Sequence, residues 1–141
     1  MHRSTSQNDR AAFRDARSGA TTVELAMVLP VLFLVVFGAF EFSRLNMLKH
    51  LASVAAYEGA REGIIIGATA ADVETQVNGV LAAGGIIDAS VTTTPATITS
   101  ATTEVQVQVS IPVDGNFWVL PAYASGAVTG ACRLSTERQG E

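Results

Sequence analysis

The sequence predicts an α+β protein in which a long N-terminal transmembrane helix extends into a small head. Residues 20–40 form an apolar run whose one ionisable residue is Glu24, and a helix of about 20 apolar residues can cross a bilayer. Beyond this run, helical spacing of apolar residues gives way to alternation of apolar and polar residues, which is typical of half-buried strands. The length of 141 residues and the 16% of charged residues fit one small domain with an anchor.

The segment before the apolar run is a basic leader. Residues 1–19 contain four arginines and two aspartates, and residues 1–18 lack hydrophobic periodicity, so we expect them to be mobile. Because basic residues stay on the cytoplasmic side of a membrane, the N-terminus should be cytoplasmic and the part from residue 45 onward extracytoplasmic. Removal of the leader leaves 5 basic and 11 acidic residues and changes the formal charge from −4 to −6. Such an acidic chain is a poor binder of nucleic acid, which requires Lys and Arg to neutralise phosphates.

Glu24 is the unusual residue of the apolar run. A carboxylate costs on the order of 3 kcal/mol at the bilayer centre and is usually kept there for a function. Glu24 lies about one helical turn from the cytoplasmic edge, so it could also reach the interface without any function. Gly19 lies five residues earlier and directly follows an Arg-Ser pair. A membrane peptidase could cut after this small residue and leave Ala20 as the new N-terminus.

The leader, Gly19, Ala20 and Glu24 together resemble the processing site of type IV prepilin-like proteins. More narrowly, residues 19–26 and residues 37–44 resemble the TadE-like pseudopilins of tight-adherence pilus systems, and the likeness is densest over residues 17–63. Leu25 departs from this pattern, because the family commonly has Phe after the Glu, but an apolar side chain is retained. The resemblance implies a pilin-like fold, cleavage after Gly19 by a prepilin peptidase, and a role of Glu24 in recognition and assembly.

The resemblance also implies a function and a set of partners. The protein would be a minor pseudopilin that takes part in assembly of a tight-adherence (Flp-type) pilus or a related secretion machine, and therefore in cell adhesion. Its partners would be a prepilin peptidase, other pilin-like subunits, the inner-membrane assembly platform and membrane lipid. It would lie in the bacterial inner (cytoplasmic) membrane as a single-pass protein, with association with the pilus as a further possibility.

A pairing of charges would give Glu24 its task. After cleavage, the ammonium of Ala20 in one subunit could pair with the Glu24 carboxylate of its neighbour inside an apolar bundle, where the lower dielectric strengthens the attraction. Burial also imposes a desolvation penalty, so such a pair would set register more than it would add stability.

Two alternatives remain open. An uncleaved single-pass envelope protein, whose head binds another envelope component, would keep residues 1–19. A secretory signal peptide would be cut after Ser53-Val54-Ala55, which lies far beyond the apolar run, and would leave Ala56 as the first residue.

In chain order we expect a cleaved leader at 1–19, a transmembrane helix at 20–42, its extracytoplasmic continuation at 43–63 and the head at 64–141. Pro30 should bend the membrane helix, because it lacks a backbone donor. The continuation follows from apolar residues that recur at three- and four-residue steps from Phe42 to Ala60. Gly59 and Gly63 mark its end.

The head should contain one short helix and a three-stranded antiparallel meander packed on the long helix. The helix is expected from Thr69, a candidate cap, to Ala83, before Gly84-Gly85. Strand character follows in 86–94, a loop in 95–102, and a clear strand in 104–111 whose alternate residues are apolar. A turn at 112–116 and an aromatic and apolar patch at 117–121 precede a last strand at 125–135, with an inner face formed by Val128, Gly130, Cys132 and Leu134.

Catalytic chemistry finds little support in the sequence. His50 has no partner at a suggestive spacing, and Cys132 is the one cysteine, so an intrachain disulfide is impossible. Asp114-Gly115-Asn116 has oxygens suited to calcium but lacks a full ligand set, and a turn explains it better. Phe117 and Trp118 are more typical of a core than of a ligand platform. We therefore predict no catalytic residues, no cofactor, no metal site and no small-molecule substrate.

Overall fold

The computed structural model describes residues 5–117 and 125–136, and it describes side chains from Gly19 onward. The chain divides into two compact units, Met1–Phe40 and Glu41–Glu141. The predicted positions of Trp118 and of the patch up to Pro121 lie outside the described residues.

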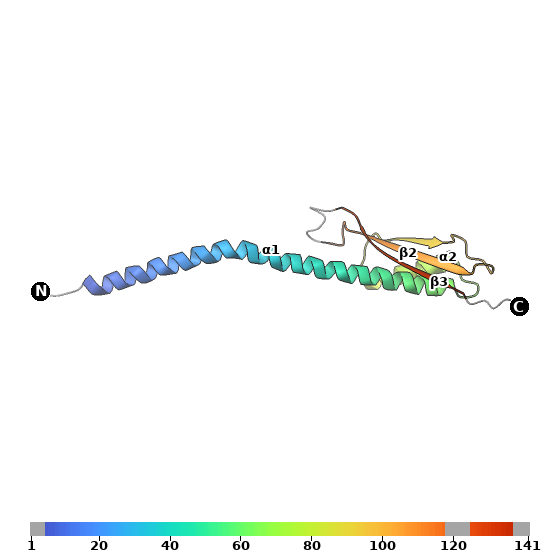
Figure 1. Cartoon of the computed structure of the whole chain (residues 1–141), viewed down its shortest axis with the longest axis horizontal. Helices are drawn as coiled ribbons and strands as arrows, with labels where there is room; N and C mark the ends of the chain where they lie inside the picture. The colour runs from blue at the N-terminus through green and yellow to red at the C-terminus, as the bar shows by residue number, and fades with distance from the viewer. Residues whose placement is uncertain (1–4, 118–124, 137–141) are drawn as a thin grey trace. The chain divides into compact units, whose positions relative to one another are not determined.

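The first element is the long helix α1, Thr5–Gly63, which is drawn from blue to green in Figure 1. It begins inside the leader at Thr5, where the lack of hydrophobic periodicity indicated no helix. The expected mobility of the leader stays a prediction. Ala and Arg recur through the leader and are good helix formers. A helix that already exists can also extend through them without a new nucleation step. The helix passes through Pro30 without a break, and the expected bend at this residue stays a prediction.

The second unit places a three-stranded antiparallel sheet against helices, which confirms the predicted α+β class. Its strands are β1 (Ser90–Thr94), β2 (Glu104–Pro112) and β3 (Ala127–Ser135), in the order β1-β2-β3. The register sets Val109 of β2 opposite Val91 of β1 and Gly130 of β3. Strand β1 begins at Ser90, later than the strand character expected from residue 86, because the preceding residues form the connection from α2.

The core lies between the inner face of the sheet and α1. Alternate residues of β2 are buried, as the sequence pattern predicts, and they meet a face of α1 that consists of small residues. The β2 residues are Val105, Val107, Val109 and Ile111, and the α1 residues are Ala52, Ala55, Ala56 and Ala60. Small side chains on the helix let the valines of the sheet approach its backbone closely.

Strand β3 approaches the backbone of α1 closely at Gly130. A Cβ atom at this position would lie 2.5 Å from the carbonyl carbon of Ala52 and 2.6 Å from the amide nitrogen of Ser53. Both are backbone atoms of a helix and cannot rotate away. The absence of a side chain at Gly130 is therefore what lets the strand pack on the helix.

Helix α2, Ala70–Ala83, forms where the sequence predicts it. Thr69 is the N-cap, and its hydroxyl accepts a hydrogen bond from the Asp72 amide while the Asp72 carboxylate accepts one from the Thr69 amide at 2.9 Å. Both hydrogen bonds together form a capping box. The buried face of α2 consists of Val73, Val77 and Leu81.

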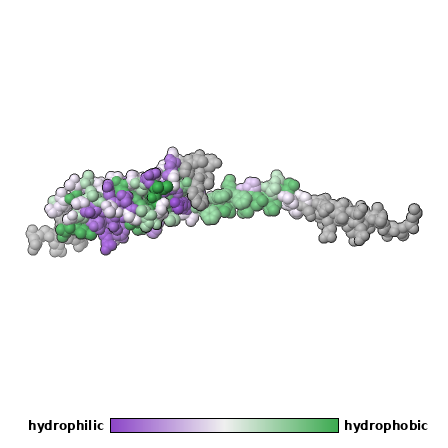
Figure 2. Space-filling model, turned by 180° about the vertical axis from the view of Figure 1, so that it is seen from behind, coloured by the Kyte–Doolittle hydropathy of each residue, from purple (hydrophilic) through white to green (hydrophobic). Residues whose placement is uncertain are grey.

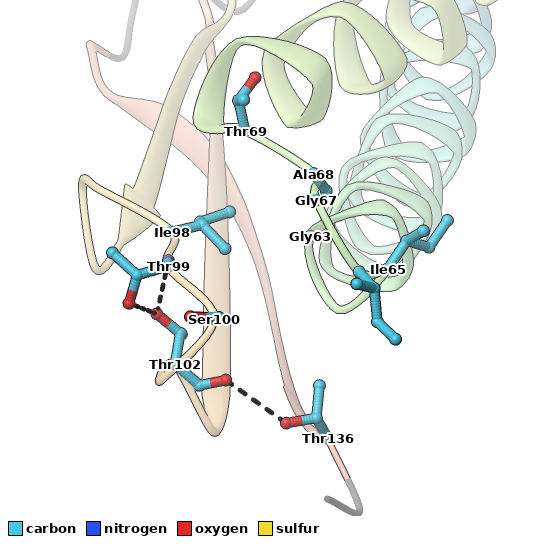
Figure 3. A pocket seen from close by; sticks show the side chains of 11 residues that line it. Gly63, Ile65, Gly67, Ala68, Thr69, Ile98, Thr99, Ser100, Thr102 and Thr136 are labelled. Atoms are coloured by element: carbon cyan, nitrogen blue, oxygen red, sulfur yellow. Dashed lines mark hydrogen bonds between the residues drawn. The ribbon is translucent and has the colours of Figure 1, made fainter.

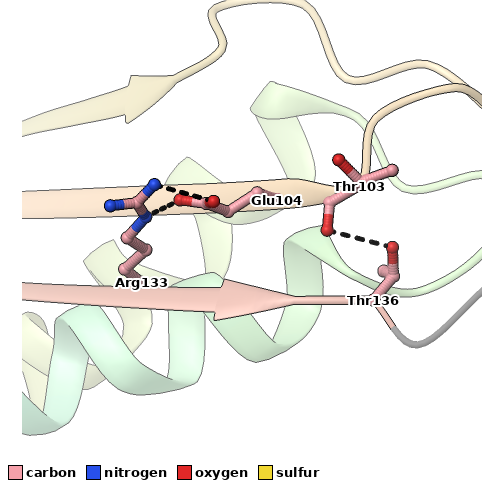
Figure 4. Close-up of polar contacts among 4 residues, drawn as sticks. All are labelled: Thr103, Glu104, Arg133 and Thr136. Carbon is pink, nitrogen blue, oxygen red and sulfur yellow. Dashed lines mark hydrogen bonds and ion pairs between the residues drawn. The ribbon is translucent and has the colours of Figure 1, made fainter.

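Polar contacts near the surface join the ends of β2 and β3 (Figure 4). Arg133 forms an ion pair with Glu104 on the neighbouring strand, and its Nη2 donates a hydrogen bond to Glu104 Oε2 at 2.8 Å. The Thr136 hydroxyl donates to the carbonyl oxygen of Thr103 at 3.2 Å. Because these groups are largely exposed, each contributes about 0.2–1 kcal/mol and the buried valines dominate stability.

Candidate assembly site

The apolar part of α1 in the first unit is the candidate site for assembly. Within the described ranges, one helix is long and apolar enough to cross a membrane, by length and composition. Figure 2 shows this stretch as a nearly continuous apolar surface, whereas the second unit has a mixed surface. Large apolar side chains are exposed all around the helix, with exposed fractions that reach 74% at Met27 and 73% at Leu34. They include Val23, Leu25, Val28, Val31, Leu32, Phe33, Val35, Val36, Phe37 and Phe40.

Such a surface requires a cover that its own unit does not supply. Complete burial of one such side chain contributes about 1.5–3 kcal/mol relative to exposure, so the twelve exposed between Val23 and Phe40 together represent about 20–35 kcal/mol. Lipid or a bundle of similar helices can supply this burial. The Phe33 and Phe37 rings, with centroids 6.3 Å apart, add a small aromatic contact on one side of the helix.

The residues predicted for processing and assembly lie at the start of this surface. Gly19, Ala20 and Glu24 are all exposed and helical. Apart from the backbone of the helix itself, no atom of the described side chains lies within 4 Å of the position that a Cβ of Gly19 would take. Glu24 follows Ala20 by four residues and therefore lies on the same side of the helix, one turn further along. Gly19 lies five residues before Glu24, on a different side.

A second polar arrangement lies in the second unit, and sequence reasoning missed it. Asn116 is 2% exposed. Its Nδ2 donates hydrogen bonds to the carbonyl oxygens of Ile87 at 2.9 Å and Pro112 at 3.0 Å, and its Oδ1 accepts one from the Ile87 amide at 3.2 Å. The backbone oxygen of Asn116 accepts a hydrogen bond from Arg44 Nε of α1 at 3.0 Å. Asn116 thus joins the end of β2 to α1 and to the connection that leads into β1.

These hydrogen bonds also decide between the two roles considered for the Asp114-Gly115-Asn116 segment, a turn or a calcium site. The segment forms the predicted turn, with Gly115 at a φ of 78° and the Asn116 amide donating to the Val113 carbonyl at 3.2 Å. The Asn116 side chain is already occupied by backbone groups and is not available to calcium. Within the described residues, no group of three or more His, Cys, Asp or Glu side chains could hold a metal ion.

An open depression of about 470 Å³ lies at the end of the second unit where α1 ends (Figure 3). Its lining is aliphatic or carries hydroxyl groups and includes no ionisable side chain. The lining residues are Gly63, Ile65, Ile66, Gly67, Ala68, Thr69, Ile98, Thr99, Ser100, Thr102 and Thr136. A site of this composition offers no general acid or base.

The remaining candidates of the sequence occupy ordinary positions. His50 is exposed on α1, and Cys132 is half-buried on β3. The alternative cleavage after Ala55 would separate Leu48, Ala52 and Ala55 from a core in which all three are fully buried. The folded second unit therefore argues against a secretory signal peptide that ends there.

Taken with the α+β second unit, the exposed apolar helix fits a single-pass membrane protein. Residues 19–61 match the family model described as TadE-like protein, which confirms the predicted resemblance over this segment. Neither a curated protein nor a solved structure matches the chain significantly.

Proposed function

We propose that this protein is a minor pseudopilin of a tight-adherence pilus or a related secretion machine. A prepilin peptidase removes residues 1–19, and the mature chain then joins other pilin-like subunits at the inner-membrane assembly platform. The leader lies in the cytoplasm and residues 43–141 lie outside the inner membrane. The protein acts as a structural subunit and is a substrate of the peptidase rather than an enzyme.

The observation that carries this proposal is the surface of α1 between Gly19 and Phe40. It exposes its apolar side chains on every side, and Glu24 is the one ionisable residue in this stretch. A helix that serves solely as an anchor gains nothing from a carboxylate close to lipid. In an assembly of helices, many registers give equivalent apolar contacts. The Glu24 carboxylate provides one polar contact that selects a single register among them.

The spacing of Ala20 and Glu24 defines two possible pairings after cleavage. The carboxylate can approach the ammonium of its own Ala20 across one helical turn, or that of a neighbouring subunit. Both pairings place a negative charge near the N-terminal end of a helix, where the helix dipole favours it. We propose that the pairing between subunits dominates in the assembled state. A Glu24 carboxylate that paired with the ammonium of its own chain would not select a neighbouring subunit or its register.

The helical conformation of Gly19 sets a condition for cleavage. A peptidase requires the scissile bond in an accessible, locally unwound form. Glycine in the middle of a helix costs about 1 kcal/mol relative to alanine, and among the described side chains, from residue 19 onward, none packs against Gly19. Local opening at this residue therefore costs less than at the good helix formers around it.

The test compares wild-type protein with Glu24→Ala and Glu24→Gln variants in native cells, each carrying a C-terminal affinity tag. N-terminal sequencing determines the first residue, and purification in a mild detergent determines which pilin-like subunits accompany the protein. We expect both variants to begin at Ala20 and to retain about one tenth or less of the partner subunits, which corresponds to about 1.4 kcal/mol of lost interaction.

Glu62→Ala provides the matched control, because it removes an acidic side chain from the same helix within the second unit. This variant should be cleaved and should retain its partners at the wild-type level. Wild-type partner recovery by Glu24→Ala would refute the pairing between subunits. A functional protein that begins upstream of Ala20 would instead favour the uncleaved envelope protein, with which the helical leader agrees.

A further inference from the structure

The end of β1 and the connection from it to β2 have an unusual composition. Eight of the twelve residues from Thr92 to Thr103 are serine or threonine, and the other four are Pro95, Ala96, Ile98 and Ala101. No residue of the segment is charged. Segments rich in Ser and Thr that also contain Pro are typical of O-glycosylated regions of extracellular proteins.

Several of these hydroxyl-bearing residues have an evident structural role. Thr102 Oγ1 accepts a hydrogen bond from the Thr99 amide at 2.9 Å and lies 3.4 Å from Thr99 Oγ1, which closes a turn. The Thr103 carbonyl oxygen accepts a hydrogen bond from Thr136. Ile98 packs against the core, so the segment is held on both sides of the turn (Figure 3). Thr92 and Thr94 lie in β1, where β-branched residues are expected.

Thr97 and Ser100 remain without such a role. Both are exposed, and within the described residues neither hydroxyl takes part in a hydrogen bond. Their neighbours Ala96 and Ala101 are small and exposed, which leaves room around both hydroxyls. The turn and Ile98 hold the backbone from which these two hydroxyls project.

The place of the segment in the second unit suits a bulky attachment. Gly63 of α1 lines the same depression as Thr99 and Ser100. It lies 22 positions after Glu41, at which the second unit begins, and this corresponds to about 33 Å along α1 at 1.5 Å per residue. An attachment here therefore leaves the Arg44–Asn116 contact at the opposite end of this unit undisturbed.

We propose that Thr97 and Ser100 are acceptor sites for O-linked glycosylation. In this reaction, the hydroxyl oxygen attacks the anomeric carbon of a glycosyl phosphate donor, such as a sugar carried on a nucleotide or on a polyprenyl phosphate. The bond from this carbon to the phosphate oxygen breaks, a bond from it to Oγ1 of Thr97 or Oγ of Ser100 forms, and the hydroxyl proton passes to a base of the transferase. No redox step is involved. The proposal goes beyond the pseudopilin function and requires neither cleavage after Gly19 nor any role of Glu24.

The test is mass spectrometry of the full-length protein purified from native cells. A glutamyl endopeptidase cleaves after Glu74 and Glu104 and releases residues 75–104 as one peptide that contains the whole segment. We expect this peptide to carry the mass of one or more hexose or N-acetylhexosamine units. Fragmentation that preserves side-chain attachments should locate them at Thr97 and Ser100.

The double variant Thr97→Val with Ser100→Ala should lose the added mass and keep the wild-type unfolding temperature, since neither hydroxyl holds the fold together. Thr75→Ala is the matched control, because it removes a hydroxyl from the same peptide and should leave the added mass unchanged. An unmodified peptide from wild-type cells, an added phosphate in place of a sugar, or a sugar that persists in the double variant would each overturn the proposal.

Discussion

Replacing Gly130 with alanine should force β3 away from α1. The new Cβ would lie 2.5 to 2.7 Å from three backbone atoms of Ala52 and Ser53, about 1 Å closer than ordinary van der Waals contact between carbon atoms. Overpacking of this kind typically costs 1–3 kcal/mol, and the rigid helix backbone places Gly130 at the upper end, at about 3 kcal/mol. In a domain of this size, 1 kcal/mol shifts the unfolding temperature by about 4–8 °C, so we expect a fall of about 12–24 °C.

The assay is thermal unfolding of the full chain in detergent, followed by circular dichroism. Detergent keeps the apolar part of α1 helical, so the transition reports on the second unit. Gly79→Ala is the matched control: Gly79 lies inside α2, and apart from the backbone of α2 itself no described atom lies within 4 Å of the position its Cβ would take. This change should stabilise the unit by about 0.5–1 kcal/mol. If Gly130→Ala unfolds at the wild-type temperature, or shifts upward as Gly79→Ala should, the proposed close packing of β3 on α1 is refuted.

Two further predictions concern polar side chains of the second unit. Asn116→Ala removes three hydrogen bonds of a buried side chain and leaves partly buried backbone groups of Ile87 and Pro112 without that partner, so it should cost about 1–3 kcal/mol. Asn78 is exposed on α2, so Asn78→Ala, the control, should cost almost nothing. Equal urea midpoints for the two variants would contradict this role of Asn116. The hydrogen bonds from the Thr69 hydroxyl and then from the Thr69 amide hold the pKa of Asp72 below its ordinary value. The unfolded chain therefore binds the proton more readily, so this contribution to stability is present above about pH 4 and is lost as the pH falls through the lowered pKa. Asp72→Asn should reduce the dependence of the unfolding temperature on acid in this window, and an unchanged acid profile would argue against the capping box.

The sequence was sufficient for those parts of the fold that depend on local patterns. Alternation of apolar residues identified β2, and a capping threonine with a glycine pair bounded α2 at nearly its observed ends. The inner face of β3 followed from the same period of two. The membrane segment and Glu24 were evident from composition, because a carboxylate stands out in an apolar run.

Features that depend on distant contacts could not be predicted in this way. From the sequence, Gly130 was one member of a strand face. Glycine is required at this position because the α1 backbone, which is remote in sequence, leaves no room for a side chain. Asn116 appeared as part of a turn, because its partners at Ile87 and Arg44 lie far away along the chain. The helical start at Thr5 was missed because the polar leader shows no hydrophobic periodicity. Its residues can nevertheless extend the helix that the apolar run already forms, because extension needs no new nucleation step.

The central claim is that this chain is trimmed at Gly19 before it works. The most direct measurement is the intact mass of the protein from native membranes beside the mass from a strain that lacks the prepilin peptidase. We expect the two masses to differ by residues 1–19, whatever other modification both carry. Equal masses, with the arginine-rich leader still present in protein that supports pilus assembly, would contradict the account.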